Sequence, residues 1–188
     1  MNLLLLALAP GIAIMLFIYT RDKYNREPLK NLLYSFLLGI ASTLPAIVIQ
    51  WSLQPVLQHY LGPKSILYYA VFSWLLVGLS EEGSKYLVLR LYAYPRKAFD
   101  EPFDGIVYSA MIGMGFASFE NILYVTSHGY VTAFLRMFLS VPAHASFAVL
   151  MGYHAGLAKF SISGRALHLL KGLLLAILFH GAFDFFLF

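Results

Sequence analysis

Eight polar side chains interrupt segments that are otherwise apolar, and each is of a type that can transfer a proton or bind a metal. They are Glu81, Glu82, Lys85, Glu120, Tyr124, His144, His180 and Asp184. A charged side chain at the centre of a bilayer costs roughly 2.5–3.5 kcal/mol on insertion scales. Folding a helix bundle requires no such group, so we treat these residues as a candidate functional site.

The first group is the run Glu81-Glu82-Gly83-Ser84-Lys85. Glu81 and Lys85 are four residues apart, so in a helix they share a face and can form an ion pair. That pair accounts for one carboxylate only, because Glu82 points about 100° away around the helix. Two adjacent carboxylates within a membrane repel each other, and one of them could serve as a general base.

Two further pairs have a spacing of one helical turn. Glu120 and Tyr124 are four residues apart, as are His180 and Asp184, so each pair shares a helix face. Each pair could be a hydrogen bond that only stabilises packing. Alternatively, Glu120 is a ligand with a phenol donor beside it, and Asp184 either binds a metal with His180 or orients its ring.

Two histidines lie in the fifth apolar segment. His144 and His154 are ten residues apart, which is about 15 Å along a helix, so they cannot share a metal ion. We interpret His154 as structural and His144 as a candidate ligand. Imidazole and carboxylate donors suit zinc, and a catalytic zinc needs three protein ligands and one open position.

The composition indicates a membrane protein. Of 188 residues, 60% are apolar and 12% are charged, whereas soluble domains have about 25% charged residues. There is no cysteine, which excludes disulfides, thiolate catalysis and cysteine-ligated metal. The net charge of +4 comes from short basic clusters between apolar runs, so we expect no nucleic-acid partner.

The apolar runs predict an all-α, polytopic transmembrane bundle in one domain covering residues 1–188. Only helices or closed barrels satisfy backbone hydrogen bonds in lipid, and runs this long without alternation favour helices. Each run has about the 20 residues needed to cross a bilayer. The six predicted spans are residues 3–19, 32–51, 66–89, 106–126, 131–157 and 167–188.

The positions of the basic residues predict an orientation. Positive charges follow the first run rather than precede it, beginning with Arg21 and Lys23, so that run is an anchor and not a cleavable signal peptide. Further clusters follow the third run and separate the fifth from the sixth. The positive-inside rule then places these three loops in the cytoplasm and both termini outside.

Helix geometry raises one difficulty and offers one packing motif. Counted from the basic loops, Glu81 should lie about 10 Å shallower in the membrane than Glu120 and His144. Tilt or a displaced third helix must absorb that difference. Gly152 and Gly156 form a GxxxG pair, which we interpret as close helix packing within the bundle.

Four motifs in this order resemble the PrsW family of intramembrane proteases. They are EE-x-x-K at Glu81 to Lys85, F-E-x-x-x-Y at Phe119 to Tyr124, the isolated His144, and H-x-x-x-D at His180 to Asp184. That family is related to the type II CAAX prenyl endopeptidases and the bacteriocin-processing membrane proteases. In those relatives the pattern is EE-x-x-x-R, F-x-x-x-H and H-x-x-x-N. The departures at Lys85, Glu120 and Asp184 match PrsW and disfavour prenylated substrates.

The resemblance covers residues 66–188 and implies a protease of the bacterial cell membrane. Its substrate would be a membrane-anchored protein, typically a single-pass anti-sigma factor. There is no H-E-x-x-H, G-x-G-D or G-x-S-x-G motif in the sequence, so other intramembrane protease chemistries fit less well.

The predicted roles follow from this interpretation. Glu81 acts as general base on a metal-bound water, with Glu82 as the other possibility, and Lys85 keeps one of them ionised. Tyr124 donates to the developing oxyanion. The predicted zinc ligands are Glu120, His144 and His180, with Asp184 either a fourth ligand or the residue that orients His180.

Two other functions are compatible with polar groups inside the membrane. Intramembrane Glu and His groups also form proton relays, so a proton-coupled transporter is the main alternative. Six short helices without an inverted repeat argue against it. The third possibility is a bundle in which the polar groups only fix helix packing.

Overall fold

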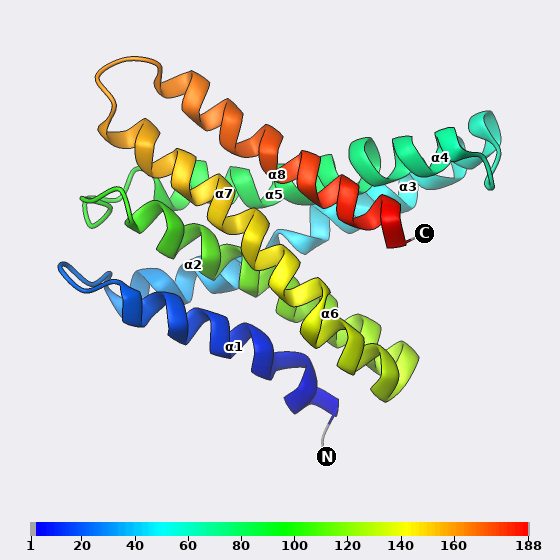
Figure 1. Ribbon diagram of the computed structural model, residues 1–188, viewed down its shortest axis with the longest axis horizontal. Helices are drawn as coiled ribbons and strands as arrows, with labels where there is room; N and C mark the ends of the chain where they lie inside the picture. The colour runs from blue at the N-terminus through cyan, green and yellow to red at the C-terminus, as the bar shows by residue number, and fades with distance from the viewer. Residues whose placement is uncertain (1–2, 188) are drawn as a thin grey trace.

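The computed structural model describes residues 3–187, and every regular element within that range is helical. Figure 1 shows the helices running roughly along one long axis. In chain order they are α1 (Leu3–Arg21), α2 (Leu29–Ala41), α3 (Thr43–Leu61), α4 (Ile66–Val71), the π-helical η1 (Phe72–Gly78), α5 (Leu79–Val88), the π-helical η2 (Leu89–Ala93), α6 (Asp104–Phe138), α7 (Ser140–Phe160) and α8 (Arg165–Leu187). The predicted all-α class is confirmed.

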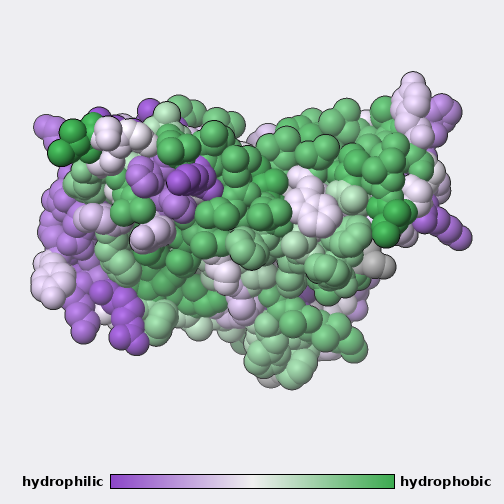
Figure 2. All heavy atoms as spheres, turned by 45° about the horizontal axis from the view of Figure 1, so that its top comes forward, coloured by the Kyte–Doolittle hydropathy of each residue, from purple (hydrophilic) through white to green (hydrophobic). Residues whose placement is uncertain are grey.

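Four helical stretches are long and apolar enough to cross a membrane: Leu3–Arg21, Leu29–Leu61, Asp104–Phe160 and Arg165–Leu187. The third contains two of the predicted spans, and the predicted span 66–89 falls on the α4–η2 segment, which π-helical turns divide. Residue 188, the predicted end of the last span, lies outside the described residues. Six crossings therefore remain a prediction. Apolar side chains cover most of the face in Figure 2, as expected for lipid contact.

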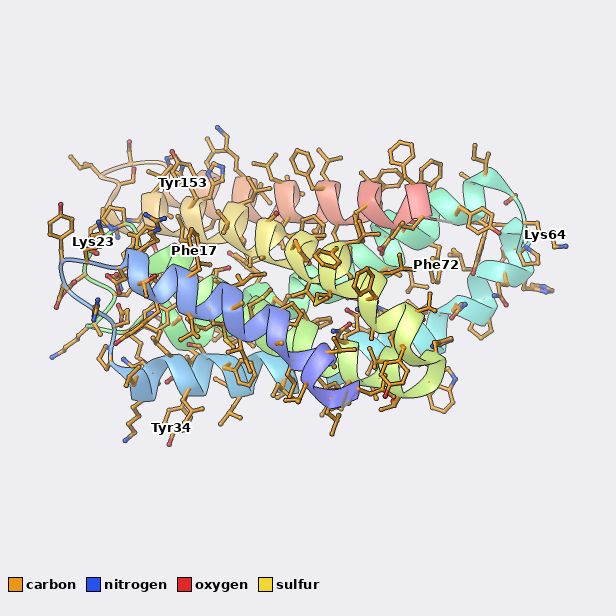
Figure 3. The ribbon with its side chains drawn as sticks, turned by 60° about the horizontal axis from the view of Figure 1, so that its bottom comes forward. Phe17, Lys23, Tyr34, Lys64, Phe72 and Tyr153 are labelled. Carbon is orange, nitrogen blue, oxygen red and sulfur yellow. The ribbon has the colours of Figure 1, made fainter. Side chains whose placement is uncertain are left out.

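The three basic loops lie at the same end of the molecule. Residues 22–28, 94–103 and 161–164 gather there, while the turn at 62–65 and the α6–α7 turn lie toward the other end (Figure 1). In Figure 3, Lys23 and Lys64 mark these opposite ends. This arrangement agrees with the prediction that the basic loops share one side.

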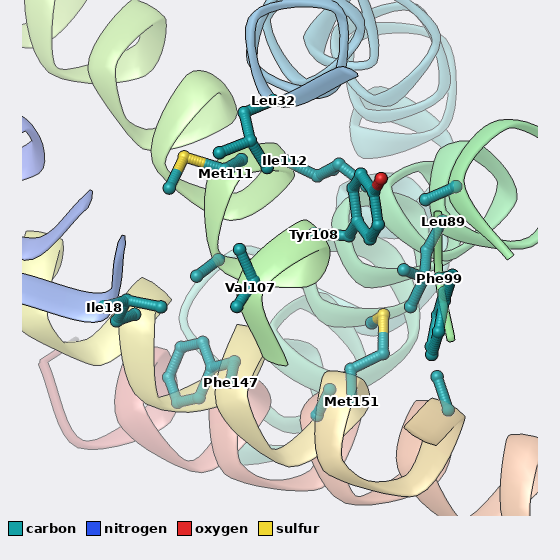
Figure 4. Close-up of a cluster of buried hydrophobic side chains, with 14 residues drawn as sticks. Ile18, Leu32, Leu89, Phe99, Val107, Tyr108, Met111, Ile112, Phe147 and Met151 are labelled. Atoms are coloured by element: carbon teal, nitrogen blue, oxygen red, sulfur yellow. The ribbon is translucent and has the colours of Figure 1, made fainter. Parts of the chain in front are cut away.

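Helix α6 forms the centre of the bundle, with α1, α2 and α7 packed on it. The main apolar core surrounds its first turns and includes Val107, Tyr108, Ile112 and Phe147 (Figure 4). Glycines allow the helices to approach closely. A Cβ on Gly152 would collide with the backbone of Gly105 and Ile106 in the first turn of α6, and one on Gly156 with the backbone of Pro102 just before it. The GxxxG pair therefore packs within the chain, as predicted.

The boundary between α6 and α7 differs from the prediction. The chain bends at Gly129, where φ is +78°, inside the gap predicted between the fourth and fifth spans. A positive φ favours glycine. A helical segment follows this bend and runs to Phe138, and α7 begins at Ser140. The segment up to Phe138 brings Arg136 back toward the cavity described below. Where the fifth span begins in the membrane remains a prediction.

Candidate active site

Four helices bring the predicted site residues together. Helix α5 carries Glu81, Glu82 and Lys85; α6 carries Glu120 and Tyr124; α7 carries His144; and α8 carries His180 and Asp184. The π-helical segments η1 and η2 flank α5 directly. π-helical turns are frequent at functional sites because they change the direction of the side chains that follow.

Glu82 is the most enclosed member of the cluster. Its Oε1 atom lies 2.7 Å from Nζ of Lys85 and 2.7 Å from Nδ1 of His180, and its side chain is fully buried. The predicted ion pair of Lys85 with Glu81 is longer, at 3.8 Å. Glu82 is therefore the closer partner of Lys85, and it holds the Nδ1 side of His180.

Glu81 faces the cavity instead. Its Oε1 atom accepts a hydrogen bond of 3.2 Å from Nε2 of Gln50. Its Oε2 atom lies 3.8 Å from Nζ of Lys85 and 3.8 Å from Nε2 of His180. Among the described residues, no hydrogen-bond donor serves this buried oxygen.

His144 lies between a cation and a carboxylate. Nζ of Lys85 is 3.3 Å from its Nδ1 atom, and Oε2 of Glu120 is 2.9 Å from its Nε2 atom. An ammonium group can only donate, so Nδ1 accepts and Nε2 carries the hydrogen that points to Glu120. Lys85 thereby fixes the tautomer of this histidine.

His180 has its two ring nitrogens in different surroundings. Nδ1 donates to Glu82, since a carboxylate accepts, and Nε2 lies 3.4 Å from Oδ2 of Asp184. Its ring stacks on Phe147 with centroids 5.0 Å apart, and lies 5.2 Å from the His144 ring. The one-turn pair of His180 and Asp184 is therefore formed, although its contact is longer than that with Glu82.

Glu120 is paired with a residue that the motifs did not identify. Nη2 of Arg136 lies 2.9 Å from its Oε2 atom, and Nε of Arg136 donates to Asn121 over 2.7 Å. Asn121 in turn donates to the carbonyl oxygen of Ala7 on α1. The guanidinium also lies over the Tyr124 ring, 4.2 Å from its centroid. Within the described residues, Tyr124 makes no hydrogen bond to Glu120.

These groups line one cavity of about 640 Å³. Five of the predicted residues reach it with acidic or imidazole groups: Glu81, Glu120, His144, His180 and Asp184. The remainder of the wall includes Tyr124, Arg136 and apolar side chains of α3, α6 and α8. Glu81, Glu120 and His144 line this one cavity despite the depth difference expected from the sequence, and the continuation of the Glu81 helix through η2 to Ala93 accounts for part of that difference.

The model of the family described as PrsW family intramembrane metalloprotease matches residues 27–188. The chain belongs to the PrsW family. It is 40% identical to Protease PrsW of Bacillus subtilis (strain 168) over 96% of this chain and 80% of the relative. It is also 38% identical to Protease PrsW of Geobacillus kaustophilus (strain HTA426), over 99% of this chain and 80% of the relative.

A further relative is Protease PrsW of Clostridioides difficile (strain 630), 36% identical over 100% of this chain and 79% of the relative. No solved structure matches the chain. Membership of the PrsW family makes this protein a membrane-embedded protease and confirms the resemblance drawn from the four motifs. It also favours proteolysis over the transport alternative.

The residues present fit the metal that a PrsW family metalloprotease implies. Glu81, His144 and His180 each offer one ligand atom, and these atoms lie within 4.8 Å of one another. The unsatisfied Oε2 atom of Glu81 adds a buried acceptor on this group. Two imidazoles and a carboxylate form a donor set typical of catalytic zinc. This group contains Glu81 where the sequence-based set has Glu120.

Sequence reasoning missed Arg136 and Gln50 as members of the site. Neither residue belongs to any of the four motifs. The available signal was the same for both: a strongly polar side chain within an apolar run. Nothing in the sequence, however, specifies the fold-back after Gly129 that carries Arg136 to Glu120.

Proposed function

We propose that this protein hydrolyses a peptide bond of a membrane-anchored protein that enters the cavity between α3, α6 and α8. A single-pass anti-sigma factor is the substrate that the family resemblance implies. The observation that supports the proposal most directly is the cavity itself. Carboxylate and imidazole groups from four helices line it, inside a bundle whose outer surface is apolar.

Glu81, His144 and His180 are the residues that would hold zinc. A zinc ion at such a site supplies a Lewis acid that polarises a carbonyl group and makes water acidic enough to react near neutral pH. Glu82 accepts from Nδ1 of His180 and so orients Nε2 toward the cavity, as carboxylates commonly do behind a metal-bound histidine. Lys85 balances the charge of Glu82. Both ring nitrogens of His144 have hydrogen-bond partners, Lys85 at Nδ1 and Glu120 at Nε2, so a bound metal would replace one of these two contacts.

Two carboxylates of the cavity then remain, Glu120 and Asp184. Asp184 lies 3.4 Å from Nε2 of His180, and we assign the general base to Glu120. It lines the same cavity, and Arg136 holds it in place. Tyr124 borders the cavity on the same helix, where its hydroxyl can donate to a developing oxyanion. The division of roles drawn from the sequence exchanges the two carboxylates, making Glu81 the base and Glu120 the ligand.

Replacing each carboxylate by glutamine distinguishes the two divisions. We expect Glu81→Gln to lose both bound metal and cleavage of a membrane-anchored reporter. Glu120→Gln should keep the metal and lose about 10²–10⁴-fold in cleavage rate, the usual contribution of a general base. Elemental analysis of the purified protein and a cleavage assay in proteoliposomes measure the two quantities.

Asp100→Asn, in an exposed loop, is the matched control and should change neither quantity. The opposite pattern, with metal lost only from Glu120→Gln, would restore the division drawn from the sequence. Full cleavage by both variants would show that the peptide bond is not hydrolysed in this cavity. Thermal unfolding of each variant shows whether it is folded.

We also propose that the three basic loops face the cytoplasm of a bacterial cell, with the termini outside. The clustering of these loops at one end supports this orientation. The chain has no cysteine of its own, so single cysteines can report it. Lys64→Cys should react with a membrane-impermeant maleimide in intact cells, and Lys97→Cys should react only after permeabilisation. The reverse result would invert the orientation.

A further inference from the structure

A second cluster of acidic side chains lies at the basic-loop end, away from the cavity. Asp22 follows α1, Glu101 lies in the loop before α6, and Asp104 begins α6. Each offers one carboxylate oxygen, and these oxygens lie within 4.8 Å of one another. Asp104 precedes Glu120 by sixteen residues on one helix, about 24 Å along its axis. The cluster is thus separate from the proteolytic site.

Both aspartates use only one of their carboxylate oxygens. Oδ2 of Asp104 accepts from the backbone N–H groups of Asp100 and Glu101, each over 2.8 Å. Oδ2 of Asp22 accepts from the backbone N–H of Glu27 over 3.1 Å. Asp22 and Asp104 are completely buried, yet within the described part of the chain neither Oδ1 atom has a hydrogen-bond partner. Such buried, unsatisfied acceptors are rare and costly.

No basic side chain among the described residues forms an ion pair with these three carboxylates. Between residues 3 and 187, the ion pairs within 4.0 Å all belong to the intramembrane cluster. The basic groups that reach this region donate to backbone oxygens instead. Lys159 donates to the carbonyl oxygens of Tyr94 and Arg96, and Arg26 donates to the carbonyl oxygen of Asp22. Lys159 therefore acts on Asp104 only from beyond ion-pair distance, and three like charges lie together without a direct partner.

Glu27 lies beside the cluster but has another explanation. Its Oε2 atom accepts a hydrogen bond from the hydroxyl of Tyr108. The group of carboxylate oxygens that lie within 4.8 Å of one another contains Asp22, Glu101 and Asp104 but not Glu27, so the proposed ligand set contains only those three.

We propose that Asp22, Glu101 and Asp104 bind a hard divalent cation, Mg²⁺ or Ca²⁺, that ties the loop between α1 and α2 to the beginning of α6. The donors are all oxygens, which both ions prefer, whereas zinc favours nitrogen and sulfur. Ligands on opposite sides of these ions lie about 4.0–5.2 Å apart, twice the usual metal–oxygen distance, so the observed spacing accommodates either ion. Glu101 is partly exposed, which leaves water a route to complete the coordination.

The cation would strengthen a junction that already exists between the two loops. Nδ2 of Asn25 donates to both carboxylate oxygens of Asp100, over 3.0 and 2.9 Å. That contact is exposed, so it contributes little by itself. A buried cation bound by both Asp22 and Asp104 would hold the two loops together more strongly than the Asn25–Asp100 contact does, because it gives two unpartnered oxygens a partner at once.

Thermal unfolding with added cation tests the proposal. The full chain, purified in an uncharged detergent and stripped with EDTA, is titrated with MgCl₂ or CaCl₂ at constant ionic strength. We expect a saturable rise in Tm, and the ion that saturates at the lower concentration is the one that the site prefers. Glu101→Gln should move the midpoint of that titration roughly tenfold or more to higher concentration, because affinity follows the number of charged ligands.

Asp100→Asn is the matched control, since it removes one negative charge from the same loop outside the ligand set, and its midpoint should stay at the wild-type value. All three proteins receive the same EDTA treatment, which acts equally on the proteolytic site. A difference between their titration midpoints therefore reports cation binding at the cluster of Asp22, Glu101 and Asp104. Elemental analysis after dialysis against the preferred ion should find one more cation per wild-type chain than per Glu101→Gln chain. Equal midpoints, equal metal contents, or a response that NaCl reproduces would each overturn the proposal.

Discussion

The two clusters of buried carboxylates lie at different depths along α6 and differ in what surrounds them. In the intramembrane cluster, every carboxylate has a basic or imidazole nitrogen within 4.0 Å. In the loop cluster of Asp22, Glu101 and Asp104, the described residues show no ion pair, and the hydrogen bonds that Asp22 and Asp104 accept come from backbone N–H groups. The first cluster lines a cavity; the second closes a junction between loops.

This difference shows how charge balance separates two uses of the same side chain. Carboxylates that are paired with Lys85, Arg136 and histidines can remain charged and fixed while they face a substrate cavity. Carboxylates that face only one another repel. They stay close together only if a bound cation or protonation reduces that repulsion. The first arrangement supports chemistry, and the second supports binding of a cation.

The largest effect on stability is expected at Glu82. It accepts from both Lys85 and His180 over 2.7 Å, so Glu82→Gln leaves a buried ammonium without its charged partner. Breaking a buried pair in this way costs about 3–5 kcal/mol. We expect a corresponding loss in the free energy of unfolding, measured by unfolding in mixed micelles of increasing SDS fraction.

Two further variants sharpen that prediction. Lys85→Met in the Glu82→Gln background removes the stranded charge and should recover most of the lost stability. Glu81→Gln should be clearly less destabilising, because Glu81 lies 3.8 Å from the ammonium. If the Glu81 variant were the less stable of the two, the partner of Lys85 would have been assigned wrongly.

Most of the fold could be predicted from hydropathy. Helices α1 and α8 match apolar runs of the sequence, and the break at Gly129 falls in a predicted gap. The positions of Ser42, where α2 ends and α3 begins, and of the π-helical turns η1 and η2 could not be predicted. They depend on packing between helices, which leaves no periodic signal in a uniformly apolar run.

Most members of the site could be predicted, but not their pairing, and Arg136 and Gln50 were missed. Ionisable residues in apolar runs indicated the carboxylates, the histidines and Lys85, because lipid makes such residues costly, and one-turn spacing added Tyr124. Spacing along one helix suggested Lys85 with Glu81 and Tyr124 with Glu120, whereas the structure pairs Lys85 with Glu82 and Glu120 with Arg136. The closest partners come from the arrangement of several helices, which one-turn spacing does not describe. The loop cluster was overlooked because acidic residues in loops are ordinary.

The smallest expected effect is that of Glu101→Gln in the loop cluster. In the absence of divalent cations its sign is opposite to that of Glu82→Gln in the intramembrane cluster. Without divalent cations, Glu101→Gln removes one of three like charges that have no direct partner, so it should stabilise the protein. Glu101 is partly exposed, so water screens the repulsion and the gain should be about 0.3–1 kcal/mol, or roughly 1–4 °C in Tm for a chain of this size. With saturating Mg²⁺ or Ca²⁺ the order should reverse, because the wild-type chain then gains the bound cation. Thermal scans of both proteins in EDTA and in each cation measure this crossing. A Glu101→Gln protein that is less stable than wild type in EDTA would mean that the three carboxylates do not repel, and the contrast between the clusters would fail at its basis.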